Sequence, residues 1–194
     1  MILIGRIIRM YTDRQQKKQR GERVLRESST LSAASEVWSD VASTMELGFR
    51  SSDSGPLLYG ELEGGPQLEI GVYEDEYDAA YRTVATTTAP EAAQHGHLVA
   101  QPLRGFARVA KAVVGAKDVP EPLAALYFVR ASEPALVTRF LHDEAVQRAL
   151  VELADRAPFL SWDDGSATLV LEGVELVHER METLIRALGK LGAR

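Results

Sequence analysis

The sequence predicts an α+β domain: an antiparallel β-sheet of about six or seven strands with helices packed on one face, preceded by a basic helical N-terminal arm. Two observations lead to this class. Four short runs rich in Val, Ile, Leu, Tyr and Thr lie between residues 57 and 103, separated by Gly-Gly-Pro, an acidic patch and Ala-Pro-Glu. This punctuation is typical of antiparallel strands. On both sides of these runs, apolar residues recur at the spacing of amphipathic helices.

The four runs predict strands at residues 57–63, 67–74, 81–88 and 97–103, and a polar turn at 50–56 leads into the first of them. Within the second run, apolar residues alternate with polar or small ones: Leu68, Ile70 and Val72 against Glu69, Gly71 and Tyr73. Such alternation indicates a strand with one face in the core and the other towards solvent.

A helix is expected before the sheet, over about residues 33–47, after a small polar linker at 27–35. Its apolar face consists of Ala34, Trp38, Val41, Ala42 and Met45. Large aromatic side chains on such a face are usually core residues, so Trp38 is expected to anchor the helix to the sheet. Ser32 or Ser35 is suited to cap the start of the helix, and Gly48 to end it.

Further strands and helices are expected after the sheet. Residues 106–116 predict a short amphipathic helix, and the nearly continuous apolar run 123–130 predicts a central strand buried on both faces. Ser132 and Asp143 are suited to cap the helical stretches that follow them. Asp164-Gly165 is a strong turn signal and predicts a hairpin over residues 159–175.

The last helix has one clear apolar face, formed by Val177, Met181, Leu184, Ile185 and Leu188. Gly189 and Gly192 predict that this helix frays at its end, because glycine weakens helices.

Composition bounds the possible functions. The 194 residues predict a single α+β domain over residues 33–194 and an arm with linker over 1–32. The chain contains no cysteine, which excludes disulfides, thiolate catalysis and sulfur-ligated zinc and suits a reducing compartment. No apolar run approaches the roughly 20 residues of a membrane span. The first eleven residues also make a poor secretory signal, because Arg6 and Arg9 interrupt the apolar run. We therefore expect a cytoplasmic protein.

The N-terminal arm differs in charge from the rest of the chain. Residues 1–30 hold eight basic and three acidic side chains, a net charge of +5, so the other 164 residues carry −11 of the total of −6. Such asymmetry suggests that the arm has a partner of its own. The residues expected to contact a membrane or partner are Arg6, Ile7, Ile8, Arg9, Arg14, Lys17, Lys18 and Arg20.

Several partners suit this arm. An apolar stub followed by a basic cluster resembles the inner-face end of a membrane anchor. The stub is too short to span a bilayer. The arm therefore either lies in the interface near anionic lipid, or belongs to a longer anchor that begins upstream of Met1. The alternatives are a solvated tail or a helix docked on the acidic body. Nucleic acid is disfavoured, because Tyr11 is the arm's one aromatic residue and the body is acidic.

The sequence offers little catalytic chemistry. His95 and His97 are weak metal candidates: residues two apart on a strand face the same way, but no third ligand is evident. His142 and His178 lie on separate predicted helices. Asp163 and Asp164 could form an acid pair beside Trp162, but a solvated hairpin turn explains them better. There is no nucleophile motif and no phosphate-binding loop. We therefore expect neither a catalytic residue nor a cofactor.

Two functions from different classes remain. The first is a non-enzymatic intracellular interaction domain, held by the arm at a protein partner or at the inner face of a membrane. The second is a small-molecule binder or enzyme with its pocket between the sheet and the helices. For this second function, the candidate polar groups are His95, His97, Tyr73 and Tyr81, and the ligand is not identified.

Overall fold

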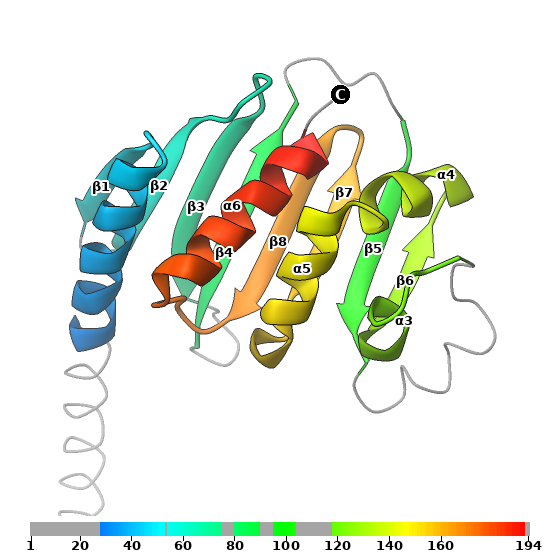
Figure 1. The fold of residues 1–194 in the computed structure, drawn as a ribbon. Helices are drawn as coiled ribbons and strands as arrows, with labels where there is room; N and C mark the ends of the chain where they lie inside the picture. The colour runs from blue at the N-terminus through cyan, green and yellow to red at the C-terminus, as the bar shows by residue number, and fades with distance from the viewer. Residues whose placement is uncertain (1–27, 53, 75–79, 90–94, 104–117, 193–194) are drawn as a thin grey trace, which may run out of the picture.

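A computed structural model describes residues 28–52, 54–74, 80–89, 95–103 and 118–192. Residues 1–27 of the predicted arm and the predicted helix at 106–116 lie outside these residues. Eight strands form one antiparallel sheet in the order β1-β2-β3-β4-β8-β7-β5-β6 (Figure 1). The strands are β1 (Gly48–Ser52), β2 (Gly55–Glu61), β3 (Gln67–Glu74), β4 (Tyr81–Thr88), β5 (His97–Pro102), β6 (Tyr127–Ala131), β7 (Phe159–Asp163) and β8 (Ser166–Glu172).

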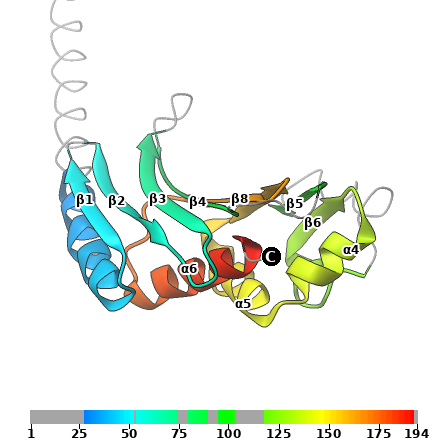
Figure 2. The same ribbon diagram turned by 90° about the horizontal axis from the view of Figure 1, so that it is seen from above.

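The helices gather on one face of the sheet, as Figure 2 shows. They are the helix of residues 28–44, α3 (Leu123–Leu126), α4 (Pro134–Leu136), α5 (Glu144–Glu152) and α6 (His178–Gly192). A π-helical turn, Val137–Leu141, extends α4, and a 3₁₀ turn, Ala154–Arg156, follows α5. The α+β class, the antiparallel pairing and the one-sided helix layer are therefore confirmed.

The core lies between the sheet and this helix layer. Strand residues facing the helices are buried in continuous rows across the sheet, such as Leu58, Ile70, Ala85, Leu169, Leu160 and Ala100. The helices contribute Trp38, Val41, Leu150, Met181, Leu184 and Leu188. Because side chains alternate along a strand, the neighbours of each buried strand residue lie on the opposite, helix-free face.

The sheet has one strand more than the upper limit predicted. β1 occupies residues 48–52, part of which was expected to be a polar turn, and it pairs with β2 from Gly48↔Tyr59 to Ser52↔Gly55. Its side chains are mostly polar because β1 is an edge strand. β1 buries little, so the apolar alternation that reveals inner strands is missing from its sequence.

The helix before the sheet differs from the prediction at both ends. It already includes residue 28, where a linker was expected, and its last helical residue is 44. Ser35 does not cap it, because the Ser35 hydroxyl donates to the carbonyl of Leu31 one turn back, at 3.0 Å. Glu46, with φ of 55°, takes the left-handed position expected of Gly48. Trp38 is fully buried, as predicted.

The run 123–130 was wrongly predicted as one central strand. Its first half is α3, and its second half belongs to β6, which lies at the edge of the sheet. Tyr127 and Phe128, on opposite sides of β6, are both buried. A strand buried on both faces is therefore not always a central strand.

Of the capping and turn residues predicted elsewhere, some were confirmed and others were not. Asp143 caps α5 as predicted: its carboxylate accepts hydrogen bonds from the backbone N–H groups of the next helical residues, at 2.9 and 3.3 Å. Asp164 and Gly165 both have positive φ, 42° and 87°, as the predicted tight hairpin turn requires. Ser132 caps no helix; its hydroxyl instead accepts from the N–H of His97. α6 continues to Gly192, which is buried against Pro66.

Among the described residues, no helix is both long and apolar enough to cross a membrane.

Candidate functional site

The helix-free face of the sheet carries exposed aromatic side chains. Tyr59, Tyr73 and Phe159 are 47%, 51% and 37% exposed, and each stands next to a buried residue of its strand. Tyr59 lies over Gly48 of the edge strand, where a Cβ atom would be 2.5 Å from the ring. A cross-strand aromatic ring of this kind shields an edge glycine, so the position of Tyr59 is explained by sheet structure.

Tyr73 instead borders a cavity of about 460 Å³ at one corner of the sheet, where β2 begins and β3 ends. We call this the Tyr73 cavity. The lining residues used below are Arg50, Leu57, Glu69, Gly71, Tyr73 and Tyr81. Cavities of a few hundred cubic ångströms are the usual size of small-molecule sites. The cavity opens around the strand ends and does not lie between the sheet and the helices, where a pocket was expected.

The missing side chain of Gly71 leaves room at the bottom of this cavity. A Cβ atom at Gly71 would lie 3.2 Å from the Tyr73 ring and 3.4 Å from a methyl group of Leu57. The glycine therefore lets the Tyr73 ring and the Leu57 side chain close over the backbone of β3. The result is an apolar floor with one aromatic wall.

Three polar side chains beside this floor are free within the part of the chain that the structure describes. The Arg50 guanidinium, the Glu69 carboxylate and the Tyr73 hydroxyl have no hydrogen-bond or ion-pair partner there. Arg50 and Glu69 carry opposite charges, yet no ion pair joins them. Among its side chains without a partner, the cavity therefore offers one cationic, one anionic and one hydroxyl group. A second carboxylate, that of Glu74, also lines the cavity but already has an interaction of its own.

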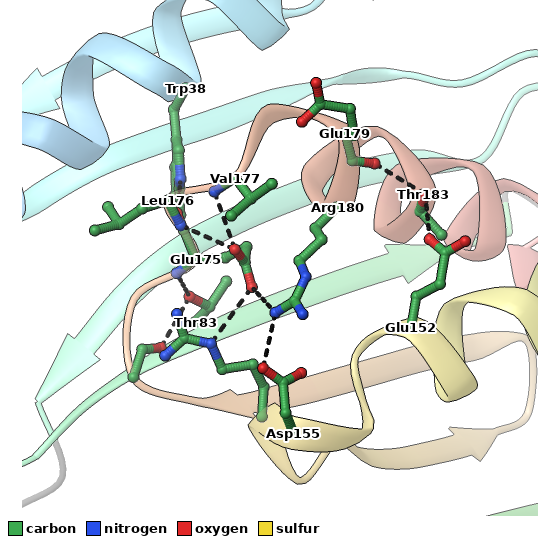
Figure 3. A network of polar contacts seen from close by, with 12 residues as sticks. Trp38, Thr83, Glu152, Asp155, Glu175, Leu176, Val177, Glu179, Arg180 and Thr183 are labelled. Atoms are coloured by element: carbon green, nitrogen blue, oxygen red, sulfur yellow. Dashed lines mark hydrogen bonds and ion pairs between the residues drawn. The ribbon is translucent and has the colours of Figure 1, made fainter.

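Behind the sheet, a buried polar cluster connects the helix of residues 28–44 to the rest of the fold (Figure 3). The indole N–H of Trp38 donates to the backbone carbonyl of Glu175 at 2.8 Å. The N–H of Glu175 donates to the hydroxyl of Thr83, at 2.9 Å, and this hydroxyl donates to the carbonyl of Gly173. We call these contacts the Trp38 latch. They connect the N-terminal helix to β4 and to the segment that leads into α6.

The side chain of Glu175 is fully buried at the centre of this cluster. One carboxylate oxygen accepts from the backbone N–H groups of Leu176 and Val177, at 3.1 and 3.0 Å. The other lies 3.7 Å from the Arg156 guanidinium and 3.8 Å from that of Arg180. A buried carboxylate requires such compensation, because its desolvation is costly. The cluster is therefore structural.

Three ionisable groups of the second half of the chain have shifted pKa values. A hydrogen bond from Arg180, at 3.0 Å, lowers the pKa of Asp155. A hydrogen bond from Arg148, at 2.7 Å, lowers the pKa of Glu152. Burial raises the pKa of Tyr127, whose hydroxyl donates to the carbonyl of Leu150 at 2.6 Å. Asp155 pairs with Arg180 of α6 and Glu152 pairs with Arg148 of its own helix, which explains their shifts without catalysis.

The histidines do not converge with the tyrosines. His95 lies 3.5 Å from Asp164 at the hairpin turn, and His97 begins β5. His142 and His178 contact Asp118 and Glu182, so each histidine is in a different setting. Within the described ranges, no group of three or more metal-ligating side chains could hold an ion.

Tyr73 and Tyr81 do share the Tyr73 cavity, as residues from opposite faces of the β3–β4 ladder. Sequence reasoning missed Arg50 and Glu69. Glu69 could have been found from the alternation along β3, which places it on the face of Tyr73. Arg50 could not, because β1 itself was not predicted.

A second cavity, of about 310 Å³, lies in the helix layer between α5 and α6. Its cations share it with Asp143 and Glu144. Arg148 and Arg186 are also paired with glutamates on their own helices, at 2.7 Å each. The balanced charge gives this cavity no clear ligand preference.

Comparisons with known proteins do not assign this chain to a family. No family model matches the sequence, and no curated protein matches it. One solved structure is similar in fold, the crystal structure of the mycobacterial trehalose monomycolate transport factor A, TtfA. It is 13% identical, with a TM-score of 0.47, over 82% of this chain and 93% of that chain. A similarity at this level says nothing about the function of this protein.

Proposed function

We propose that this protein is a non-enzymatic interaction domain tethered to an anionic membrane surface through its basic N-terminal arm. The net charge of +5 in residues 1–30, against −11 in the remainder, supports this function. Each Lys or Arg close to an anionic surface contributes about 1 kcal/mol of attraction. Ile7 and Ile8 would add apolar contact with the interface.

The observation that carries the proposal is the Trp38 latch. The arm leads into the helix of residues 28–44, and Trp38 on this helix is fully buried with its indole hydrogen-bonded to the carbonyl of Glu175. A tether held in this way attaches the whole domain to whatever the arm binds. The acidic body would be repelled by the same anionic surface, which favours contact through the arm alone.

Flotation with liposomes tests this function. We expect the full chain to float with vesicles containing phosphatidylserine and not with neutral vesicles, and to be released by high salt. Changing Arg14, Lys17, Lys18 and Arg20 to Gln should abolish flotation. The matched control changes the described residues Arg130, Arg139, Arg148 and Arg186 to Gln, which removes the same charge from the body and should leave flotation unchanged. Equal flotation of the two variants would exclude the arm as an electrostatic tether.

The Tyr73 cavity supports a second function, the binding of a small molecule. Its volume, its apolar floor and the free Arg50, Glu69 and Tyr73 side chains favour this function. A thermal-shift screen of the full chain with common metabolites tests it, because a ligand that binds the folded state raises the melting temperature. A Tyr73→Ala variant should lose the shift of any ligand that binds there.

A further inference from the structure

We infer that the Tyr73 cavity binds a small zwitterion of the amino-acid class, with its carboxylate on Arg50 and its ammonium group on Glu69. This inference rests on the second function proposed above and specifies its ligand.

The strand register places the two charges at two different edges of one floor. Arg50, Leu57 and Gly71 form a single transverse row across β1, β2 and β3 on the helix-free face. At about 4.8 Å per strand, Arg50 starts roughly 10 Å from Gly71 across the sheet. Glu69 lies two residues from Gly71 along β3, about 7 Å away on the same face. Both side chains are long enough to reach over the Leu57–Gly71 floor.

The two charged groups suit the two ends of an amino acid. A guanidinium presents parallel N–H groups that match a carboxylate, which makes arginine well suited to this group. A glutamate carboxylate accepts the N–H donors of an ammonium group. Because Arg50 and Glu69 have no partner within the described residues, a ligand would not have to break an existing ion pair.

The floor between the charges suits an apolar or aromatic side chain. The Tyr73 ring and a methyl group of Leu57 lie within 3.4 Å of where a Cβ on Gly71 would be, so they meet over the glycine. An aromatic ligand could stack on the Tyr73 ring. A cavity of about 460 Å³ has room for an amino acid or a dipeptide.

Ligands with one charge fit less well. A simple anion on Arg50 would share the cavity with the Glu69 carboxylate, and a simple cation on Glu69 would share it with Arg50. Repulsion from the second group would offset part of the attraction to the first. A neutral apolar ligand would remove water from both charged groups without replacing it, which costs free energy. A zwitterion meets both charges.

Isothermal titration calorimetry of the full chain tests the inference. The probes are phenylalanine, N-acetyl-phenylalanine, phenylalanine amide and the dipeptide Gly-Phe. The blocked probes lack the ammonium and the carboxylate respectively. We expect phenylalanine or Gly-Phe to bind, and each blocked form of phenylalanine to bind at least tenfold more weakly than the zwitterion.

Variants then assign each charge to its partner. Arg50→Gln should weaken binding of phenylalanine at least tenfold and remove the preference over phenylalanine amide. Glu69→Gln should weaken it similarly and remove the preference over N-acetyl-phenylalanine. The matched controls are Arg130→Gln, at the other edge of the sheet, and Glu63→Gln, in the β2–β3 turn; both should bind as the wild type does. Gly71→Ala, which raises the floor, should also weaken binding.

Each failure has its own meaning. A blocked probe that binds as well as phenylalanine overturns the zwitterion, and so does the absence of binding by both zwitterions at millimolar concentration. The small-molecule function itself survives either result if the metabolite screen finds a ligand whose thermal shift Tyr73→Ala abolishes. It fails only if that screen finds none.

Discussion

At the residue scale, the Trp38 latch shows how one buried hydroxyl connects distant parts of the chain. Thr83 accepts a hydrogen bond from the N–H of Glu175 and donates one to the carbonyl of Gly173. The importance of Trp38 was predictable from its place on an apolar helical face. Glu175 was not, because a glutamate before a helix usually signals a solvated cap, and its burial depends on arginines that approach from other elements.

This role of Thr83 can be tested with Thr83→Val. Valine has nearly the same shape but cannot accept the hydrogen bond, so the buried N–H of Glu175 loses its partner. Such a loss costs roughly 1–3 kcal/mol in the free energy of unfolding. Thr86→Val is the control on the same strand, since its hydroxyl makes only an exposed contact at 3.4 Å. It should change stability by less than about 0.5 kcal/mol. Urea denaturation measures both, and equal effects would contradict a special role for Thr83.

At the element scale, the strands were predicted better than their places in the sheet. The bounds of β3 and β4 match the predicted runs residue for residue. The predicted turn was also confirmed at Asp164-Gly165, where the backbone needs residues that tolerate positive φ. The expectation that α6 frays at its glycines was wrong, because helix propensity describes an isolated helix and takes no account of tertiary packing. Gly192 is buried where α6 meets Pro66 and Thr87, and the sequence pattern of the helix contains no sign of that contact.

Two glycines of α6 should therefore respond oppositely to alanine. A Cβ on Gly192 would lie 2.7 Å from atoms of Pro66 and Thr87, so Gly192→Ala should lower the free energy of unfolding by about 1–3 kcal/mol. At Gly189 the nearest atom, of Leu62, is at 3.7 Å, an ordinary contact. Gly189→Ala should raise stability by up to about 1 kcal/mol through helix propensity. Thermal unfolding of the two variants measures the difference. The same sign for both would contradict this packing.

At the scale of the whole molecule, an ion pair and a hydrogen bond join the helices of the second half. Asp155, after α5, pairs with Arg180 of α6, and Glu152 of α5 accepts from Thr183 of α6. The candidate site belongs to the same scale, since Arg50 and Glu69 line one cavity only because β1 and β3 flank β2. Strand order is a property of the complete sheet. Local patterns along the sequence therefore indicated the strands and Tyr73, but they did not indicate the Tyr73 cavity.

The Asp155–Arg180 ion pair makes the folded state sensitive to acid. The lowered pKa of Asp155 means that its contribution to stability is fully present above the pKa of the unfolded chain, about 4, and is lost as the pH falls further. The Asp155→Asn variant should therefore have a lower melting temperature than the wild type at pH 7. The difference between the two melting temperatures should shrink towards pH 2.5. High salt at pH 7 should also reduce it, because the pair is exposed. A difference that stays constant with pH would exclude this ion pair as the cause.

The position of the β7–β8 hairpin has a consequence for synthesis of the chain. β4 and β5 are consecutive strands, yet the hairpin lies between them, and Thr83 of β4 pairs with Leu171 of β8. On the ribosome, β1–β4 and β5–β6 emerge long before the strands that join them. Until then, β4 and β5 each leave an edge without its native neighbour, and such edges can pair with other chains. The nascent chain therefore depends on its last third to close the sheet. Translation that stops before β8 would leave β1–β4 and β5–β6 as separate sheet fragments with unpaired edges, which are prone to aggregate unless chaperones bind them.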